Sequence, residues 1–286
     1  MVVQKFNTKA KIILTGEHAV VYGFTAVATP IPLEMSVQIV DHSENCVTQN
    51  DDLKNMIAQI VNDDYIVKEF FKRYDLSISS DIPISAGLGS SAALSLCIAK
   101  VVMFIENGLQ MGFEYNDKKL IELANMVEAL FHMHPSGIDV TTIALQKMIK
   151  FNSLQKYSHV QNKSELYIGA INTGKRNIQT KDAIQKLHDE RNYQLFKVIG
   201  EIGEEFSKAL ENADYHMIAC LINENQKILK TLGCVTQKME EACEYLLSND
   251  AIAAKMTGAG FGGTVFGLFR SLPNLKHCQV QSKLET

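Results

Sequence analysis

A glycine-rich stretch in the first third of the chain contains the residue types that hold phosphate groups. In PISAGLGSSAALSL, residues 83–96, Gly87 and Gly89 stand between a predicted strand and a predicted helix. Glycine has no Cβ, so both can take a positive φ and let several backbone N–H groups converge on one anion. The helix adds free N–H groups and the positive end of its dipole. The stretch therefore predicts a polyphosphate loop; the alternative is a plain turn with Ser90 or Ser91 as the helix N-cap.

Near the N-terminus, three chemically active side chains surround one strand-to-turn junction. The segment KIILTGEHAVVYG, residues 11–23, carries the cation of Lys11, the carboxylate of Glu17 and the imidazole of His18. Two plain interpretations stay open here. Lys11 is then a solvated charge at a strand end, and His18 is a core histidine with its hydrogen bonds satisfied.

A pair of carboxylates follows in the middle of the chain. In EALFHMHPSGIDVTT, residues 128–142, Glu128 lies on a predicted helix and Asp139 follows in a Pro/Gly turn eleven residues later. Such a pair can divide its work, one carboxylate ligating Mg²⁺ and the other accepting a proton or orienting a nucleophile. The alternative is an acid on a helix surface and an unrelated turn aspartate.

A second glycine cluster lies near the C-terminus, in KMTGAGFGGTVFGL, residues 255–268. Four glycines within six residues exceed what a hairpin turn needs. They predict a close backbone approach, either to a ligand or to the first glycine loop.

These segments, in this order, resemble the motifs of the GHMP kinases, the family of galactokinase, homoserine kinase, mevalonate kinase and phosphomevalonate kinase. The loop lacks both the GxxxxGK[ST] of a P-loop and the GxGxxG of a dinucleotide site. Residues 11–23 are similar to the mevalonate kinase pattern K-x-I-L-x-G-E-H-A-V-V-x-G, and residues 128–139 keep its Glu-to-Asp spacing. Galactokinases typically continue GEH with Thr-Asp-Tyr, which this chain does not.

The resemblance implies a role for each matching residue. Asp139 is the catalytic acidic residue and Lys11 approaches the substrate hydroxyl and the phosphates, while Mg²⁺ is held by Ser91 and Glu128. The phosphates of ATP are bound by the loop, which comprises Ser85, Ala86, Gly87, Leu88, Gly89, Ser90 and Ser91. The acceptor is bound by Glu17, His18 and, in INTGKRNIQTKDAI, Thr180. The implied reaction is phosphorylation of the primary hydroxyl of mevalonate in isoprenoid precursor synthesis.

Several residues differ from the mevalonate kinase pattern. Lys9 and Ala10 replace Pro-Gly before Lys11, His132-Met133-His134 replaces His-Gly-x, and Phe261 interrupts the last glycine run, as in galactokinases. The alternative acceptors are therefore phosphomevalonate or a sugar. A catalytically dead regulatory relative is disfavoured because Lys11, Glu128 and Asp139 are all present. His132 and His134 have no third ligand nearby in the sequence, so they do not predict a metal site.

Composition limits the partners. With 286 residues, 46% hydrophobic and 21% charged, and a net charge of −4, the chain predicts a globular protein that binds neither nucleic acid nor membrane. The N-terminal residues lack the features of a signal peptide, and the six cysteines form no CxxC pair, so we expect a cytoplasmic protein with reduced thiols. A small-molecule substrate is expected, and a homodimer is a family-level expectation.

The pattern along the chain predicts an α+β fold. Strands are predicted at KIIL, TAVATPI, MSVQIVD and DLSISSDIPI, a buried helix ends at Gly108, and a helix over residues 117–131 begins at a capping Asp117. The sequence pattern of residues 182–248 predicts a mostly helical segment. The resemblance implies the two-domain GHMP fold, with a mixed-sheet ATP-binding domain at 1–165, a ferredoxin-like domain at 166–286 and the ATP site between them.

Overall fold

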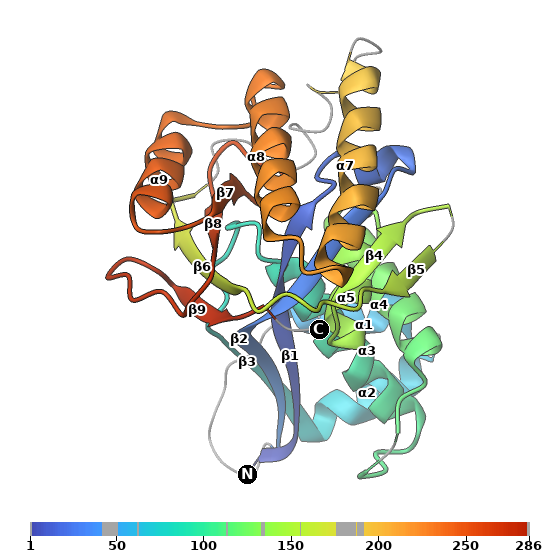
Figure 1. Cartoon of the computed structure of the whole chain (residues 1–286). Helices are drawn as coiled ribbons and strands as arrows, with labels where there is room; N and C mark the ends of the chain where they lie inside the picture. The colour runs from blue at the N-terminus through green and yellow to red at the C-terminus, as the bar shows by residue number, and fades with distance from the viewer. Residues whose placement is uncertain are drawn as a thin grey trace. The chain divides into compact units, whose positions relative to one another are not determined.

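The structure is a computed structural model that describes residues 2–41, 51–61, 63–112, 114–132, 135–154, 156–175, 187 and 192–284. The chain forms two compact units. Unit 1 comprises Met1–Ala10, Leu33–Ile82 and Ser90–Leu145, and unit 2 comprises Lys11–Pro32, Pro83–Gly89 and Gln146–Thr286. Two long strands, β1 (Val2–Thr15) and β2 (Ala26–Asp41), contribute residues to both units (Figure 1).

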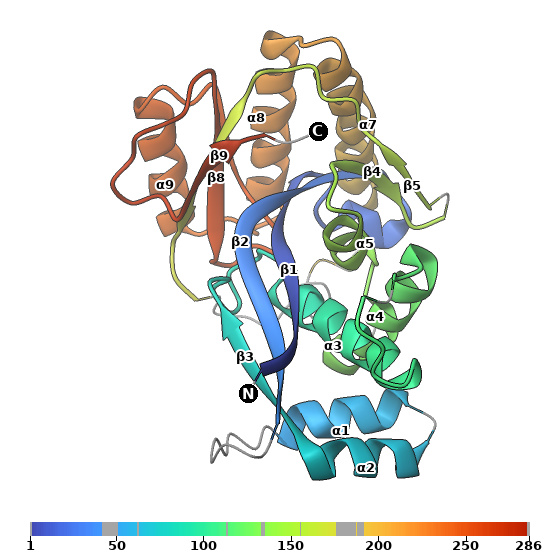
Figure 2. The same ribbon diagram turned by 90° about the horizontal axis from the view of Figure 1, so that it is seen from below.

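Unit 1 is built around a helix that is apolar on all sides, as a helix in the middle of a core must be. This helix, α3 (Ser90–Glu106), contacts α4 (Asp117–Phe131) and α5 (Ile138–Leu145). Two amphipathic helices, α1 (Asp51–Ile60) and α2 (Asp64–Arg73), lie side by side next to it (Figure 2). Strand β3 (Tyr74–Ser80) pairs antiparallel with the Met35–Asp41 part of β2. The result is one core that unites strand and helix residues, including Phe6, Ile39, Ile98, Val102 and Val127.

Unit 2 contains a wholly antiparallel four-stranded sheet in the order β7-β8-β6-β9. Its strands are β6 (Tyr167–Asn172), β7 (Ala253–Met256), β8 (Thr264–Phe269) and β9 (Val280–Lys283). Helices α8 (Tyr215–Thr231) and α9 (Gln237–Ser248) pack against the β7–β8 part of this sheet, and α7 (Tyr193–Glu211) runs beside α8 (Figure 1). The 3-10 turn η1 (Ala19–Tyr22) contacts α7, and β4 (Ile149–Asn152) pairs with Ala26–Ala28 of β2 and with β5 (Lys156–His159).

Helix α8 also covers an edge of this sheet with its amide side chains. Among the strands that the structure describes, β7 lies at the edge of the sheet and pairs with β8 alone. There the backbone N–H of Ala254 donates to Asn223 Oδ1 at 3.4 Å, and that of Met256 donates to Gln226 Oε1 at 3.0 Å. These bonds satisfy strand donors that would otherwise be exposed or unpaired, so β7 is held on both sides.

Helix α7 is tied to the start of β2 by a polar cluster. Thr25 Oγ1 donates to Glu204 Oε1 at 2.5 Å, and Lys150 Nζ donates to Glu204 Oε2 at 2.9 Å. Burial raises the pKa of Glu204, but these two bonds outweigh it, so the pKa lies below its ordinary value. Glu204 therefore stabilises this part of unit 2 in its ionised form.

The predicted α+β class is confirmed, with differences in detail. The helix predicted over 117–131 has those bounds, but its cap is Asn116, whose side chain accepts from the backbone N–H of Lys119, and not Asp117. TAVATPI and MSVQIVD belong to one strand, because β2 continues through Pro30 and Pro32. Cys220 is exposed on α8, although its surroundings in the sequence are apolar. Among the described residues no helix has the length and apolarity to cross a membrane.

Candidate functional site

The first glycine loop, residues 83–89, is held by backbone bonds from two directions. Gly87 and Gly89 have φ values of 86° and 78°, as the sequence predicts for an anion-binding loop. The backbone N–H of Lys11 on β1 donates to the Leu88 carbonyl at 3.1 Å, and the Lys11 Nζ donates to the Gly87 carbonyl at 3.2 Å. These bonds turn the Gly87 and Leu88 carbonyls toward β1.

The second glycine cluster supports the same loop from β8. The backbone N–H of Thr264 donates to the Ala86 carbonyl at 2.9 Å. A Cβ added to Gly263 would lie 2.8 Å from the Ala86 carbonyl oxygen, so only glycine permits this approach. The predicted contact between the two glycine clusters is thereby confirmed. Phe261 takes the left-handed conformation that glycine adopts easily, with φ 59°, and its N–H donates to the Cys234 carbonyl at 2.7 Å.

In unit 1, a pair of serines holds both oxygens of the Glu128 carboxylate. Ser91 and Ser95 are four residues apart on α3 and face α4, where they donate to Glu128 Oε1 and Oε2, each at 2.8 Å. The ring of His132 approaches the same group, with Nε2 3.3 Å from Ser91 Oγ and 3.5 Å from Glu128 Oε1. The sequence prediction names Ser91 and Glu128 together, and the structure brings them into direct contact.

Burial and charge act on Glu128 in opposite directions. Burial raises the pKa of this carboxyl group, the hydrogen bonds from Ser95 and Ser91 lower it, and the charge of Asp139 raises it again. The net result is a pKa above the ordinary value. Asp139 itself lies in the first turn of α5, two residues after Gly137, and is half-buried. The two carboxylates named by the sequence are therefore close enough to influence each other.

This set of donors fits a magnesium ion. Mg²⁺ prefers oxygen ligands and is commonly held by one or two carboxylates together with substrate phosphates. Glu128, Asp139 and the Ser91 hydroxyl supply oxygen donors in one region of unit 1. In the described part of the chain no three His, Cys, Asp or Glu residues gather as an all-protein metal cage, which an ion shared with phosphates does not require.

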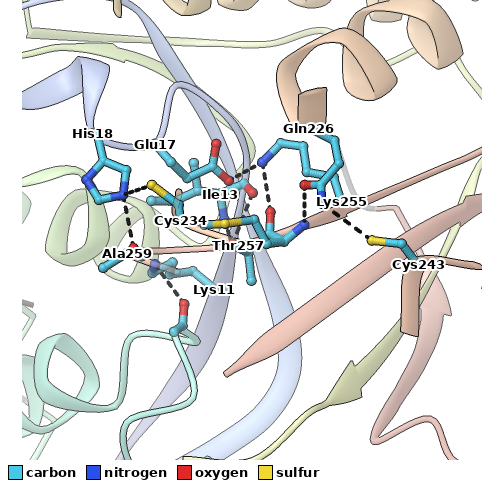
Figure 3. Close-up of polar contacts among 12 residues, drawn as sticks. Lys11, Ile13, Glu17, His18, Gln226, Cys234, Cys243, Lys255, Thr257 and Ala259 are labelled. Carbon is cyan, nitrogen blue, oxygen red and sulfur yellow. Dashed lines mark hydrogen bonds and ion pairs between the residues drawn. The ribbon is translucent and has the colours of Figure 1, made fainter. Parts of the chain in front are cut away.

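The first motif forms a second cluster, in unit 2, around a buried ion pair (Figure 3). The ammonium of Lys255 on β7 donates to Glu17 Oε1 and, at 2.8 Å, to the carbonyl of Met256. Neither charged side chain has exposed surface. His18, with a φ of 61°, places Nε2 3.0 Å from the Ala259 carbonyl and 3.7 Å from Cys234 Sγ. Burial raises the pKa of the Cys234 thiol to about 12, so this cysteine stays protonated.

The second glycine motif contacts the first motif through alternate residues. Lys255 bonds Glu17, the Thr257 hydroxyl accepts from the Ile13 N–H at 3.0 Å and donates to its carbonyl at 3.1 Å, and Ala259 bonds His18 (Figure 3). Lys255 makes its contact from β7, whereas Thr257 and Ala259 follow the end of the strand, and Ala259 makes its contact through its backbone carbonyl. The second glycine motif therefore holds β1 and the turn after it in place through these hydrogen bonds.

Sequence reasoning missed Ser95, Lys255 and Thr257 as parts of these clusters. The only available signals were weak: a serine one helical turn after Ser91, and a lysine inside the apolar run AIAAKM. Thr180 and His134 lie outside the described residues. The structure places the glycine loop beside Lys11. The predicted roles stay predictions for Lys11, Glu17, His18 and the loop residues.

Two family descriptions match the chain. GHMP kinases N terminal domain matches residues 55–147, and GHMP kinases C terminal matches residues 206–281, so together they cover more than half of the sequence. The chain belongs to the GHMP kinases. As a GHMP kinase it is an ATP-dependent kinase, and the predicted family and fold are confirmed.

Individual relatives of this GHMP kinase were found by sequence and by structure. Mevalonate kinase of Pyrococcus furiosus is 27% identical over 92% of the chain and 88% of its own length, and that of Methanocaldococcus jannaschii is 28% identical over 91% and 89%. The crystal structure of the Methanococcus jannaschii mevalonate kinase has a TM-score of 0.74 at 26% identity, covering 93% of this chain and 90% of that one. The crystal structure of L. major mevalonate kinase in complex with R-mevalonate has the same TM-score of 0.74 at 20% identity, covering 94% of this chain and 88% of that one, and shows a similar fold.

Proposed function

We propose that this chain transfers the γ-phosphoryl group of ATP to the primary hydroxyl of mevalonate. The observation that carries the reaction type is the joint placement of Ser91, Glu128 and Asp139, oxygen donors for a phosphate-bound cation beside a second carboxylate. The choice of mevalonate as the acceptor is supported by the similarity of more than nine tenths of the chain to mevalonate kinases.

In the proposed reaction the protein mainly positions groups and balances charge. The N–H groups of residues 85–91 bind the β- and γ-phosphates of ATP. The C5 hydroxyl oxygen of mevalonate forms a bond to the γ-phosphorus, the bond from that phosphorus to the bridging oxygen of ADP breaks, and Asp139 accepts the hydroxyl proton. Lys11 stabilises the negative charge on the phosphoryl oxygens.

The magnesium site of this proposal consists of Ser91 and Glu128. When bound, Mg²⁺ neutralises charge on the phosphates. Ser95 holds the second oxygen of Glu128, so the carboxylate keeps its orientation through the reaction. His18 lies on the acceptor side, and Thr180 belongs to the same side of the proposal. The side chain of Glu17 has no exposed surface, so its part in the proposal is to hold a charge next to His18 and not to contact the acceptor.

We also propose a domain division at residue 165. The N-terminal ATP-binding domain then comprises residues 1–165 and the C-terminal domain residues 166–286. The match to GHMP kinases N terminal domain falls inside the first range and the match to GHMP kinases C terminal inside the second. This division follows the sequence, whereas compact unit 2 takes Lys11–Pro32 and Pro83–Gly89 from the N-terminal side of residue 165.

A coupled ADP-release assay tests the proposed function. The chain is given Mg·ATP and, separately, mevalonate, phosphomevalonate, galactose and homoserine. Turnover on mevalonate alone supports the proposal. Turnover on one of the other three, with none on mevalonate, refutes the acceptor and retains the reaction type. Phe261 is the observation that favours testing galactose, because the turn that carries it departs from the mevalonate kinase pattern.

A further inference from the structure

The ion pair between Glu17 and Lys255 is unusual because it is buried completely. Lysine is rarely found without exposed surface, and Lys255 has none. Its ammonium has two oxygen partners, Glu17 Oε1 and the Met256 carbonyl, and lies 5.7 Å from the centre of the Phe266 ring. Because burying a charge costs free energy, a completely buried lysine calls for a physical reason.

Stability does not provide that explanation. Taking two charges out of water costs about as much free energy as their attraction returns, and apolar replacements are often equally stable. Burial raises the pKa of Glu17 and lowers that of Lys255, which reflects this cost. In addition, Glu17 Oε2 is buried and accepts no hydrogen bond from the described residues. A leucine in place of Glu17 and a methionine in place of Lys255 would fill this space without the free-energy cost of removing two charges from water.

The position of Glu17 suggests what the pair does. The carboxylate stands directly before His18 and is attracted by two lysines, Lys255 from β7 and Lys11 from β1. Lys11 also donates to Gly87 of the phosphate loop. An unbalanced charge on Glu17 would therefore act on the two side chains that the proposed function assigns to the acceptor and the phosphates.

We propose that Lys255 is a positioning residue that neutralises Glu17 beside an anionic acceptor. The proposal rests on the proposed function: mevalonate carries a carboxylate at the end opposite its primary hydroxyl. With Lys255 present, Glu17 and Lys255 together are neutral, so Glu17 neither repels the acceptor carboxylate nor draws Lys11 away from the phosphate loop. Without Lys255, both effects appear, since charges in a protein interior are poorly screened.

Three variants test this assignment: Lys255→Met, Glu17→Gln and the double variant. Each variant is assayed at several pH values, because burial raises the pKa of Glu17 and the effect of its charge grows as the carboxylate ionises. We expect Lys255→Met to raise the KM for mevalonate about tenfold or more, with a smaller change in the KM for ATP. The double variant should return the mevalonate KM to within about threefold of the wild type. Lys150→Met, which removes the partly exposed pair with Glu204, is the control and should leave both KM values unchanged.

Several results would overturn the assignment. If the double variant binds mevalonate as weakly as Lys255→Met, the two side chains contribute by contact or packing and not by balancing charge. An equal rise in the KM for ATP and for mevalonate would have the same meaning. If Lys255→Met does not fold, the double variant alone decides, because a neutral pair then replaces a neutral pair and a near-normal mevalonate KM is required. A wild-type chain without activity on mevalonate refutes the proposed function itself, which the panel assay detects separately.

Discussion

Replacement of Gly263 by alanine should disturb the phosphate loop through a single added carbon. In the structure the new Cβ would lie 2.8 Å from the Ala86 carbonyl oxygen, about 0.6 Å short of an ordinary contact at 3.4 Å. Gly263 cannot retreat easily, because its N–H donates to Gly174 at 2.9 Å and its carbonyl accepts from the Thr173 N–H and hydroxyl, both at 2.8 Å. Ala86 must therefore move, and the loop N–H groups move with it.

The size of the effect combines two costs. A residue with a side chain at φ 94° is strained by about 1–3 kcal/mol, and the contact with Ala86 adds about 1–2 kcal/mol. We expect Gly263→Ala to lower the free energy of unfolding by about 2–5 kcal/mol, measured by urea denaturation. The KM for ATP should rise about tenfold or more, because misplaced N–H groups bind phosphate poorly.

Gly233→Ala separates strain from contact. Gly233 has a similar φ of 75°, but a Cβ added there would meet nothing within 4 Å. This variant should lose only the strain of about 1–3 kcal/mol and keep the wild-type KM for ATP. If Gly263→Ala shows a normal KM for ATP, or if the two variants raise it equally, the inference that β8 positions the phosphate loop is refuted.

Three further predictions concern single polar groups. Asp139→Asn should lower kcat by about a hundredfold to ten-thousandfold with ATP binding retained, as measured by steady-state kinetics and calorimetry; near-normal kcat removes Asp139 from its role. Ser95→Ala leaves an oxygen of Glu128 unpaired and should cost about 1–3 kcal/mol in urea unfolding. Ser207→Ala, which loses only a bond to a backbone carbonyl, should cost less, and equal losses would contradict the argument. Because the pKa of Glu204 is lowered, its stabilisation is present above the ordinary Glu pKa and is lost as the pH falls through the lowered value. Glu204→Gln should thus be less stable than the wild type at about pH 7, and the difference in stability should disappear as the pH falls through that lowered value; a difference that persists in acid would attribute the loss to packing.

Much of the site could be predicted from sequence because its residues lie close together along the chain. The loop at 83–91 and the pair Glu128 and Asp139 each occupy one short segment, so the combination of residue types can be recognised without knowledge of the fold. The helix at 117–131 was equally predictable, since the period of its apolar residues is local. Its cap was not, because Asn116 and Asp117 have similar capping ability and only the backbone conformation distinguishes them.

The clusters could not be predicted because they depend on distant segments. Ser95 meets Glu128 across 33 residues, and Lys255 meets Glu17 across 238. No periodicity in a single sequence encodes which lysine faces which glutamate, and Lys255 in AIAAKM could equally have been an exposed strand residue.

The amino-acid sequence by itself determined the family, the reaction type and the order of the motifs, because each motif is a run of neighbouring residues with local conformational demands. Only the tertiary structure decided which groups balance one another: two serines on one carboxylate, and one buried lysine on another. The physical reason is that desolvation and charge pairing depend on what surrounds a side chain in space, and the neighbours that surround Glu17 and Glu128 are supplied by folding.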